Sequence, residues 1–441
     1  MWDDDNGITS SMCLFLSSCI GNGEDQNCEP CLATFFISNK NFISSLCHKV
    51  QVASEKLGSD DTFPWSCTVL SQCADIVVGI CHHKKIQTLL TTSSTNPVPH
   101  LARVLCTGRT FVSDKHTTAL RGVRASVLRA LLSLSATAAG RPAFYSSIVS
   151  SSGGDEVGSI ISILVALAKT SESDTESSRE MALMIVANLL TPIDDSAQHS
   201  KSVNAIVKEM QRYGFVDDLL KLCTSEDTPI IVKHRCIAVV DRLLCTKSVG
   251  LDEDAVNSLW REFIRAVTDE HWSNDSEDTL TDSLASIALH LVKIVGTGVK
   301  KVSWTHPKCA ITLVNLLPTP QVGPKGPFTA ESVCLPPRKG TAGSAYAKAA
   351  SKPSFHANVL KIMISFLDAC PDHVTSIVKE GGIERLVCIL ANSSRQHQTI
   401  TNNAASALAR LAKSGGPEVK QRCRDLRGME ILLALGQSGK I

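Results

Sequence analysis

The sequence has few aromatic residues and almost no excess of charge of either sign. Aromatic side chains make up 5% of the 441 residues and hydrophobic ones 43%, so leucine, isoleucine, valine and alanine must supply the core, as in stacked helices. The formal net charge is +1, and basic residues such as Lys300 and Lys301 are not interleaved with aromatic ones. A nucleic-acid-binding surface would need that pattern, so the composition predicts no nucleic-acid partner.

Long hydrophobic runs and an export signal are also absent. No apolar run reaches the roughly 18 residues that a membrane-spanning helix needs. The first residues, Met1 to Asp5, are acidic where a secretory signal is basic. These features predict no membrane partner and a cytoplasmic location, with the nucleus as the alternative. In either compartment the 17 cysteines are expected to be reduced and to act as small apolar residues.

The motifs of common enzyme and nucleotide-binding sites are missing. The sequence contains no G-x-S-x-G, no H-E-x-x-H, no G-x-G-x-x-G and no phosphate-binding loop. This predicts a protein that is not an enzyme and that binds no cofactor.

Two segments that contain cysteine and histidine are candidate metal sites. Cys28 and Cys31 have the spacing of half a zinc site, and Cys47 with His48 could add a third ligand, but a second spaced pair is missing. The segment Cys81 to Lys85 is interpreted as the polar end of a helix, where cations suit the helix dipole. The sequence therefore predicts no metal site.

A helical unit occurs twice near the end of the sequence. In the first copy a short helix opens at Pro371 and ends at Gly381 and Gly382; in the second, a short helix opens at Pro417 and ends at Gly428. The copies are offset by 46 residues. A period of roughly 40–47 residues with several helices is typical of armadillo and HEAT repeats. The fold predicted is therefore all-α, an armadillo/HEAT-like right-handed α-solenoid in which each repeat buries its neighbour's apolar face.

The same pattern continues through most of the chain and divides it into three parts. Residues 1–317 are predicted to form helical repeats, of which 1–110 are irregular, and residues 353–441 form the C-terminal repeats. Residues 318–352 contain six prolines, at positions 318, 320, 324, 327, 336 and 337. Because proline cannot continue a helix, this stretch is predicted to be a loop without regular structure. A further break is expected at 91–100, where two prolines follow an apolar helix.

The order short helix, glycine, helix, long helix resembles the armadillo repeat, most specifically at 123–190 and 353–437. The resemblance implies that the third helix of each repeat lines a concave groove, where a recurrent asparagine binds the backbone of an extended peptide. The matching position here is Asn188, and the same place is taken by Arg242 and Arg410 in other repeats and by Ser133 and Phe366 in two more. The asparagine ladder of importin-α is thus mostly absent. We predict a non-catalytic protein-binding scaffold or adaptor with Asn188, Arg242 and Arg410 in its groove; the alternative is that they are only solvated.

The segment Thr401 to Ala412, followed by Pro417 to Val419, is similar to repeats of the UCS-type myosin chaperones. The tetratricopeptide region that animal members carry is absent from this sequence. This resemblance implies a second candidate function, a chaperone or assembly factor for a motor protein.

Overall fold

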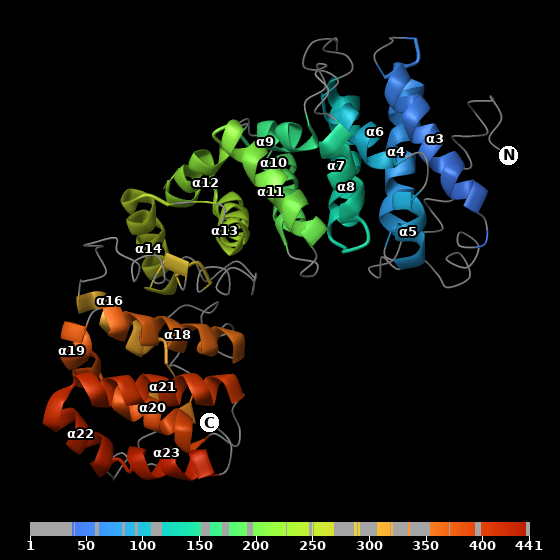
Figure 1. Cartoon of the computed structure of the whole chain (residues 1–441). Helices are drawn as coiled ribbons and strands as arrows, with labels where there is room; N and C mark the ends of the chain where they lie inside the picture. Colours follow the sequence, from blue (N-terminus) through green and yellow to red (C-terminus); the bar gives the residue numbers. More distant parts are fainter. Residues whose placement is uncertain are drawn as a thin grey trace. The chain divides into compact units, whose positions relative to one another are not determined.

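The computed structural model describes the following residues: 38, 40–57, 61–81, 84–92, 96–106, 117–150, 159–169, 176–191, 197–225, 227–246, 249, 251–268, 286–288, 290–291, 307–317, 319–320, 334–335, 353–369, 371–392 and 398–437. The chain divides into two compact units, 1–222 with 227–248 and 223–226 with 249–441 (Figure 1). The division predicted from the sequence, at 317 and 353, places its boundaries elsewhere and stays a prediction.

The described part of the first unit is built of helices in sets of three. They are α3 (Lys40–Lys56), α4 (Phe63–Ile80), α5 (Lys84–Thr92), α6 (Pro97–Cys106), α7 (Thr117–Ser135), α8 (Arg141–Ser150), α9 (Ile160–Lys169), α10 (Glu176–Leu190), α11 (Ala197–Arg212), α12 (Phe215–Thr224) and α13 (Ile230–Cys245). α4 packs on α7, α7 on α10 and α10 on α13, and we call these four the third-helix row. α3, α6 and α9 form a second row in the same order. This stacking makes the unit an α-solenoid.

The local sequence explains why the third helices pack this way, and α13 is the clearest example. Pro229 is extended, with φ −54° and ψ 139°, so the helix begins directly after it. Val232, Cys236, Val239 and Leu243 recur every three or four residues and are buried. The helix ends at Cys245, directly after the buried Leu243 and its neighbour Leu244.

α4 departs from the expectation that no apolar run would be long enough to span a membrane. By length and composition it is the one helix of the described chain that passes this test, and 61% of it is buried inside the structure. It lies between α3 and α7, and its buried residues include Val69, Cys73, Ile76 and Ile80. This packing is that of a core helix.

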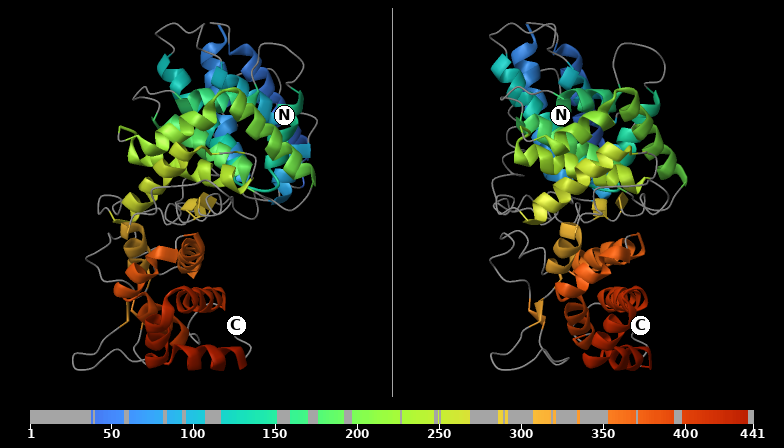
Figure 2. Two further views of the ribbon diagram at one scale, coloured as in Figure 1. Left: turned by 60° about the vertical axis from the view of Figure 1, so that its left-hand side comes forward. Right: turned by 90° about the vertical axis from the view of Figure 1, so that its left-hand side faces the viewer.

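The second unit repeats the arrangement. Its described elements are α14 (Glu253–Thr268), α16 (Pro307–Asn315), β1 (Thr319–Pro320), β2 (Cys334–Leu335), α18 (Pro353–Ala369), the 3₁₀ turn η6 (Pro371–His373), α19 (Val374–Lys379), α20 (Gly382–Ala391), α21 (Gln398–Ser414), α22 (Gly416–Asp425) and α23 (Gly428–Gln437). α18 packs on α21 as successive third helices do in the first unit, and α20 packs on both α21 and α23. Figure 2 shows the orange-to-red helices of this unit layered in chain order in two further views.

The two glycines that defined the repeat occupy equivalent positions, as predicted, but each lies one residue past the turn in which the sequence placed it. Gly382 and Gly428 are the first residues of α20 and α23. Each follows a residue with positive φ, Gly381 at 80° and Arg427 at 58°. A Cβ at Gly382 would lie 2.5 Å from Ile377 Cγ2 and 2.8 Å from Ile377 O, whereas a Cβ at Gly428 would lie 3.1 Å from Cys423 O. Ile377 and Cys423 are themselves 46 residues apart, so the close approach belongs to the repeat.

Two expectations about proline-rich stretches are wrong in part. Within 318–352, β1 pairs antiparallel with β2, and both contact α20. Proline excludes helix there but is tolerated in an edge strand, and pairing between separate segments has no local signal. Within 91–100, Pro97 begins α6, because proline suits the first turn of a helix. The remaining residues of 318–352 lie outside the described ranges.

Candidate partner-binding surface

The third-helix row of the first unit presents one face that the core does not use. Along each helix, exposed or half-exposed residues recur at three- to four-residue spacing, which places them on one side. We call them the row face; they are Thr68, Ser71, Asp75 and Val78 of α4, Gly122, Ala125, Arg129 and Ser133 of α7, Ser177, Met181, Met184 and Asn188 of α10, and Ile231, Arg235, Ala238 and Arg242 of α13. The face mixes small residues, two methionines and three arginines.

Ion pairs link successive third helices across this face. Arg235 Nη2 of α13 lies 2.7 Å from Glu180 Oε1 of α10, and both side chains are mostly covered. Arg129 Nη2 of α7 lies 3.5 Å from Asp75 Oδ1 of α4, where both are more exposed. The partners are 54 and 55 residues apart in the sequence, so each pair links one third helix to the next. The exposed pair contributes little stability, since solvent screens it.

Asn188 lies on the row face, but its amide already has a structural contact. Its Nδ2 donates to Ser135 Oγ of α7 at 3.1 Å, and that hydroxyl donates to Leu132 O at 2.8 Å. The asparagine is half-buried. It therefore joins two third helices, in addition to any contact with a partner.

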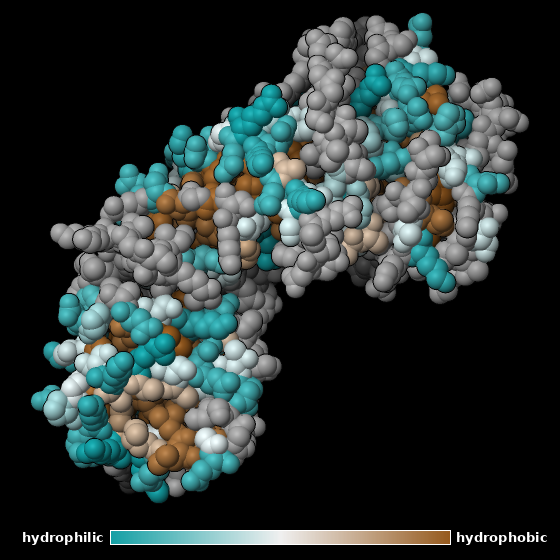
Figure 3. Space-filling model, viewed as in Figure 1, coloured by the Kyte–Doolittle hydropathy of each residue, from teal (hydrophilic) through white to brown (hydrophobic). Residues whose placement is uncertain are grey.

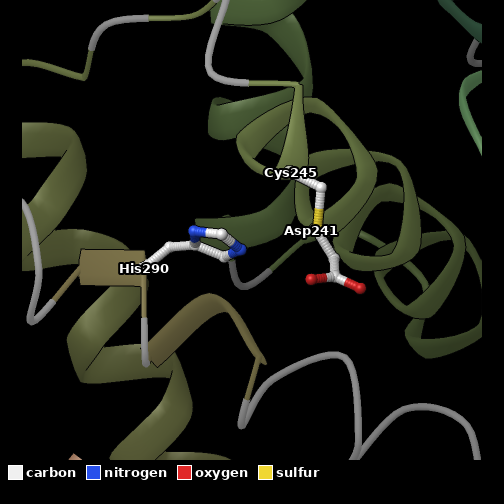
Figure 4. A group of neighbouring side chains, drawn as sticks. All are labelled: Asp241, Cys245 and His290. Carbon is white, nitrogen blue, oxygen red and sulfur yellow. The ribbon is translucent and has the colours of Figure 1, made fainter. Parts of the chain in front are cut away.

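Arg242 lies on α13 with its side chain 40% exposed, and its Nη1 is 3.5 Å from Oδ2 of the buried Asp241. Figure 4 shows Asp241 and Cys245 on α13, one turn apart. Two ligands on one helical turn do not make a metal site, which needs at least three. His290, drawn with them, belongs to the second unit.

Arg410 of α21 takes part in the second unit's counterpart of these ion pairs. Its Nε donates to both carboxylate oxygens of Asp368 of α18, at 2.8 and 2.9 Å. Its side chain is 38% exposed and that of Asp368 57%. The arginine thus lies at the edge of a third helix, where its ion pair is open to water.

Phe366 does not occupy the equivalent of these positions, and the sequence-based alignment is wrong there. Its side chain is buried, and its ring stacks on that of His373 at 5.6 Å between centroids. The offset of 46 residues, supported by the bond from Asn403 Nδ2 of α21 to Ala357 O of α18, aligns Arg410 with the half-exposed Ile364 instead. The sequence-based alignment took, on each third helix, the residue that directly precedes a leucine. This rule fails at Phe366, because Phe366 is itself one of the buried residues of its helix. Ser133 of α7 lies on the row face as aligned.

A buried polar cluster at the carboxyl ends of α7 and α10 was not foreseen. The Arg141 guanidinium donates from Nε to Ser135 O at 3.0 Å and from Nη1 to Thr191 O at 2.7 Å. The Tyr145 hydroxyl donates to Leu189 O at 3.0 Å, and burial raises the pKa of Tyr145 to about 12. These donors satisfy carbonyls that a helix end leaves without intrahelical partners.

Two buried cysteines have thiols of raised pKa. Burial raises the pKa of Cys67 and of Cys81 to about 11, so neither is a ready nucleophile or ligand. Cys47 is buried in α3, while Cys28 and Cys31 lie outside the described residues. The expectation that all cysteines are reduced is wrong for Cys388 of α20, which is disulfide-bonded. A disulfide forms between cysteines that are close in the folded structure, and the spacing of cysteines in the sequence does not show which ones are close.

Comparison with known proteins gives structural neighbours only. No family model matches the chain, and no curated protein is significantly similar to it. An engineered protein of the Northeast Structural Genomics Consortium is 16% identical with a TM-score of 0.40, covering 72% of this chain and 98% of its own. SYS-1 is 13% identical with a TM-score of 0.38, covering 91% of this chain and 68% of its own. Kap121p bound to RanGTP is 10% identical with a TM-score of 0.29, covering 97% of this chain and 47% of its own, so this chain spans about half of Kap121p. The fold assignment rests on the helix packing described above.

Proposed function

We propose that this chain is a non-catalytic protein-binding scaffold or adaptor of the armadillo-like type. An extended segment of a partner protein would lie along the third-helix row. The observation that carries the proposal is the row face, which continues over four successive helices and holds side chains that the core does not need. Solenoids present such continuous surfaces to long partners.

The side chains of the row face can make many weak contacts with the main chain of a partner segment. Met181 and Met184 are half-exposed on α10, and methionine adapts its shape to varied apolar side chains. Arg242 and Arg129 can donate to carbonyl or carboxylate oxygens, in bonds that charge strengthens. Since both arginines already face carboxylates, a partner's acidic group or backbone would replace or share those contacts.

The test uses partners recovered by affinity pull-down and identified by mass spectrometry. The double substitution Arg129→Ala with Arg242→Ala, both on the row face, should weaken binding of the recovered partner and leave the melting temperature nearly unchanged. The reason is that exposed ion pairs contribute only about 0.5 kcal/mol. Arg422→Ala is the matched control, because Arg422 also forms a partly exposed ion pair, with Glu384, but lies on α22 rather than on a third helix. Normal binding by the double variant, or its unfolding, would contradict the proposal.

The same pull-down separates the two finer functions. Motor heads among the recovered proteins would favour a chaperone or assembly factor for a myosin-type motor, which rests on the sequence of 401–419 alone. Other clients, recovered from cytoplasmic extract, would favour a general adaptor.

A further inference from the structure

One cysteine of the second unit differs from the other cysteines whose side chains the structure describes. Cys388 of α20 is disulfide-bonded and completely buried. The other nine are reduced, and they are Cys47, Cys67, Cys73, Cys81, Cys106, Cys223, Cys236, Cys245 and Cys423. A disulfide framework that stabilises a small fold pairs most of its cysteines, whereas a single bond among reduced thiols is typical of a redox-sensing or catalytic pair.

The side of α20 that carries Cys388 faces the segment around β1 and β2. Arg385 lies one turn before Cys388 on that side. Its Nη1 donates to Leu317 O at 2.8 Å and its Nη2 to Asn315 Oδ1 at 3.2 Å. β1 begins two residues after Leu317 and pairs with β2, whose first residue is Cys334. Both strands contact α20, so the topology brings a second cysteine to the helix of Cys388.

We propose that Cys334 is the partner of Cys388, and that their disulfide is a redox-sensitive strap that holds β2 on α20. A ladder of two-residue strands is too short to be stable by itself. The two cysteines are 54 residues apart in the sequence, so their bond closes a long loop and restricts the chain strongly. Opening the bond removes the covalent attachment of β2. The strap is separate from the row face and does not depend on the function proposed above.

Opening the strap needs a thiol reductant, such as a dithiol. Cys388 is completely buried beneath the mixed polar and apolar surface that Figure 3 shows for this unit, so the reductant must reach the bond through its other sulfur, in β2. A thiolate of the reductant attacks that sulfur, forms a mixed disulfide and releases the thiolate of Cys388. The second thiol of the reductant then displaces the β2 cysteine. The reductant leaves as a cyclic disulfide, and two electrons and two protons remain on the protein as two thiols.

The first measurement identifies the bond in the whole chain. The protein is equilibrated in oxidising glutathione buffer, its thiols are blocked with N-ethylmaleimide, and its tryptic peptides are analysed by mass spectrometry without reduction. We expect peptide 386–395, which contains Cys388, to be linked to peptide 326–338, which contains Cys334. Linkage to peptide 309–325 or 362–379, which contain Cys309 and Cys370, would overturn the proposal. Recovery of Cys388 as a blocked thiol would do the same.

The second measurement is the rate of limited tryptic cleavage after Arg338 or Lys339, close to Cys334 in the sequence. Cleavage should be slow without reductant and about tenfold faster with dithiothreitol, because an attached backbone must open locally before a protease can cut it. Cys334→Ser should be cleaved rapidly in both buffers, and circular dichroism checks that it is folded. Cys106→Ser, which removes an exposed reduced thiol of the first unit, should behave like the unaltered chain.

Two outcomes of this second measurement would contradict the strap. One is an equal cleavage rate of the unaltered chain with and without dithiothreitol. The other is a Cys334→Ser chain that still responds to dithiothreitol, or a Cys106→Ser chain that no longer does, because the responsive bond would then involve another cysteine.

Discussion

Arg141 joins the carboxyl ends of two successive third helices through one side chain. Its two bonds reach Ser135 O and Thr191 O, the latter 50 residues away. This pairing has no signal in the sequence, because neither residue belongs to a motif or to the apolar period. The same holds for Asn188, which was predicted at its place on a third helix but not with Ser135 as its partner. Position on a helix follows from local spacing, whereas the partner depends on how repeats stack.

Replacing Arg141 by methionine should destabilise the protein by about 3 kcal/mol. The substitution keeps much of the apolar stem but leaves two carbonyl groups without their charged donor, and each bond to a charged group is worth roughly 1.5–3 kcal/mol. Urea unfolding measures the change in the free energy of unfolding. Lys208→Met, on the exposed side of α11, is the control and should shift it by less than about 0.5 kcal/mol. Equal effects of the two changes would show that the cluster does not stabilise the fold.

His356 of α18 makes stability depend on mild acid. Burial lowers the pKa of His356 from 6.5 to about 4, so the folded state holds the ring neutral. Below pH 6.5 the unfolded chain binds a proton that the folded chain does not, and stability falls as the pH drops from 6.5 to 4. The loss attributable to this residue should approach about 3 kcal/mol at pH 4. His356→Phe should flatten that part of the stability–pH curve; an unchanged slope would contradict the burial of a neutral ring.

At the scale of the element, helix bounds were predicted best where a run of apolar residues at helical spacing begins or ends at a proline or a glycine. The bounds of α13 follow from Pro229 and the buried valines, and the paired turns before α20 and α23 follow from the glycines. α16 was not predicted, because its nine residues are too short to show a period and lie next to the prolines. β1 and β2 were missed because two-residue strands carry almost no pattern of their own.

The close approach at the turn before α20 predicts an ordered pair of glycine substitutions. Gly382→Ala should cost more than about 2 kcal/mol, because the added Cβ would overlap the backbone oxygen of Ile377 at 2.8 Å. Gly428→Ala should cost less, because its nearest backbone contact is 3.1 Å and the two side chains nearby can move slightly. Thermal unfolding of both variants gives the order. The reverse order would contradict the closer backbone approach at Gly382.

At the scale of the whole molecule, the α-solenoid class was predictable and the partner was not. Repeated apolar stripes at similar intervals require stacking, whichever residues supply them, so the class follows from period and composition. The row face could be anticipated only in outline. Asn188, Arg242 and Arg410 mark third helices, but which neighbours they bridge depends on contacts between repeats. In the function proposed here, the residues that select a partner are the half-exposed ones between them, such as Ala125, Met184 and Ala238, which follow no motif.

Site-specific photo-crosslinking tests the row face most directly. A benzoylphenylalanine placed at Ala125, Met184 or Ala238, each half-exposed on a different third helix, should capture one and the same partner protein from cell extract. The same group at Lys208, exposed on α11, should not capture it. If the partner is captured from Lys208 as efficiently as from the three row positions, or from Lys208 alone, the third-helix row is not the binding surface.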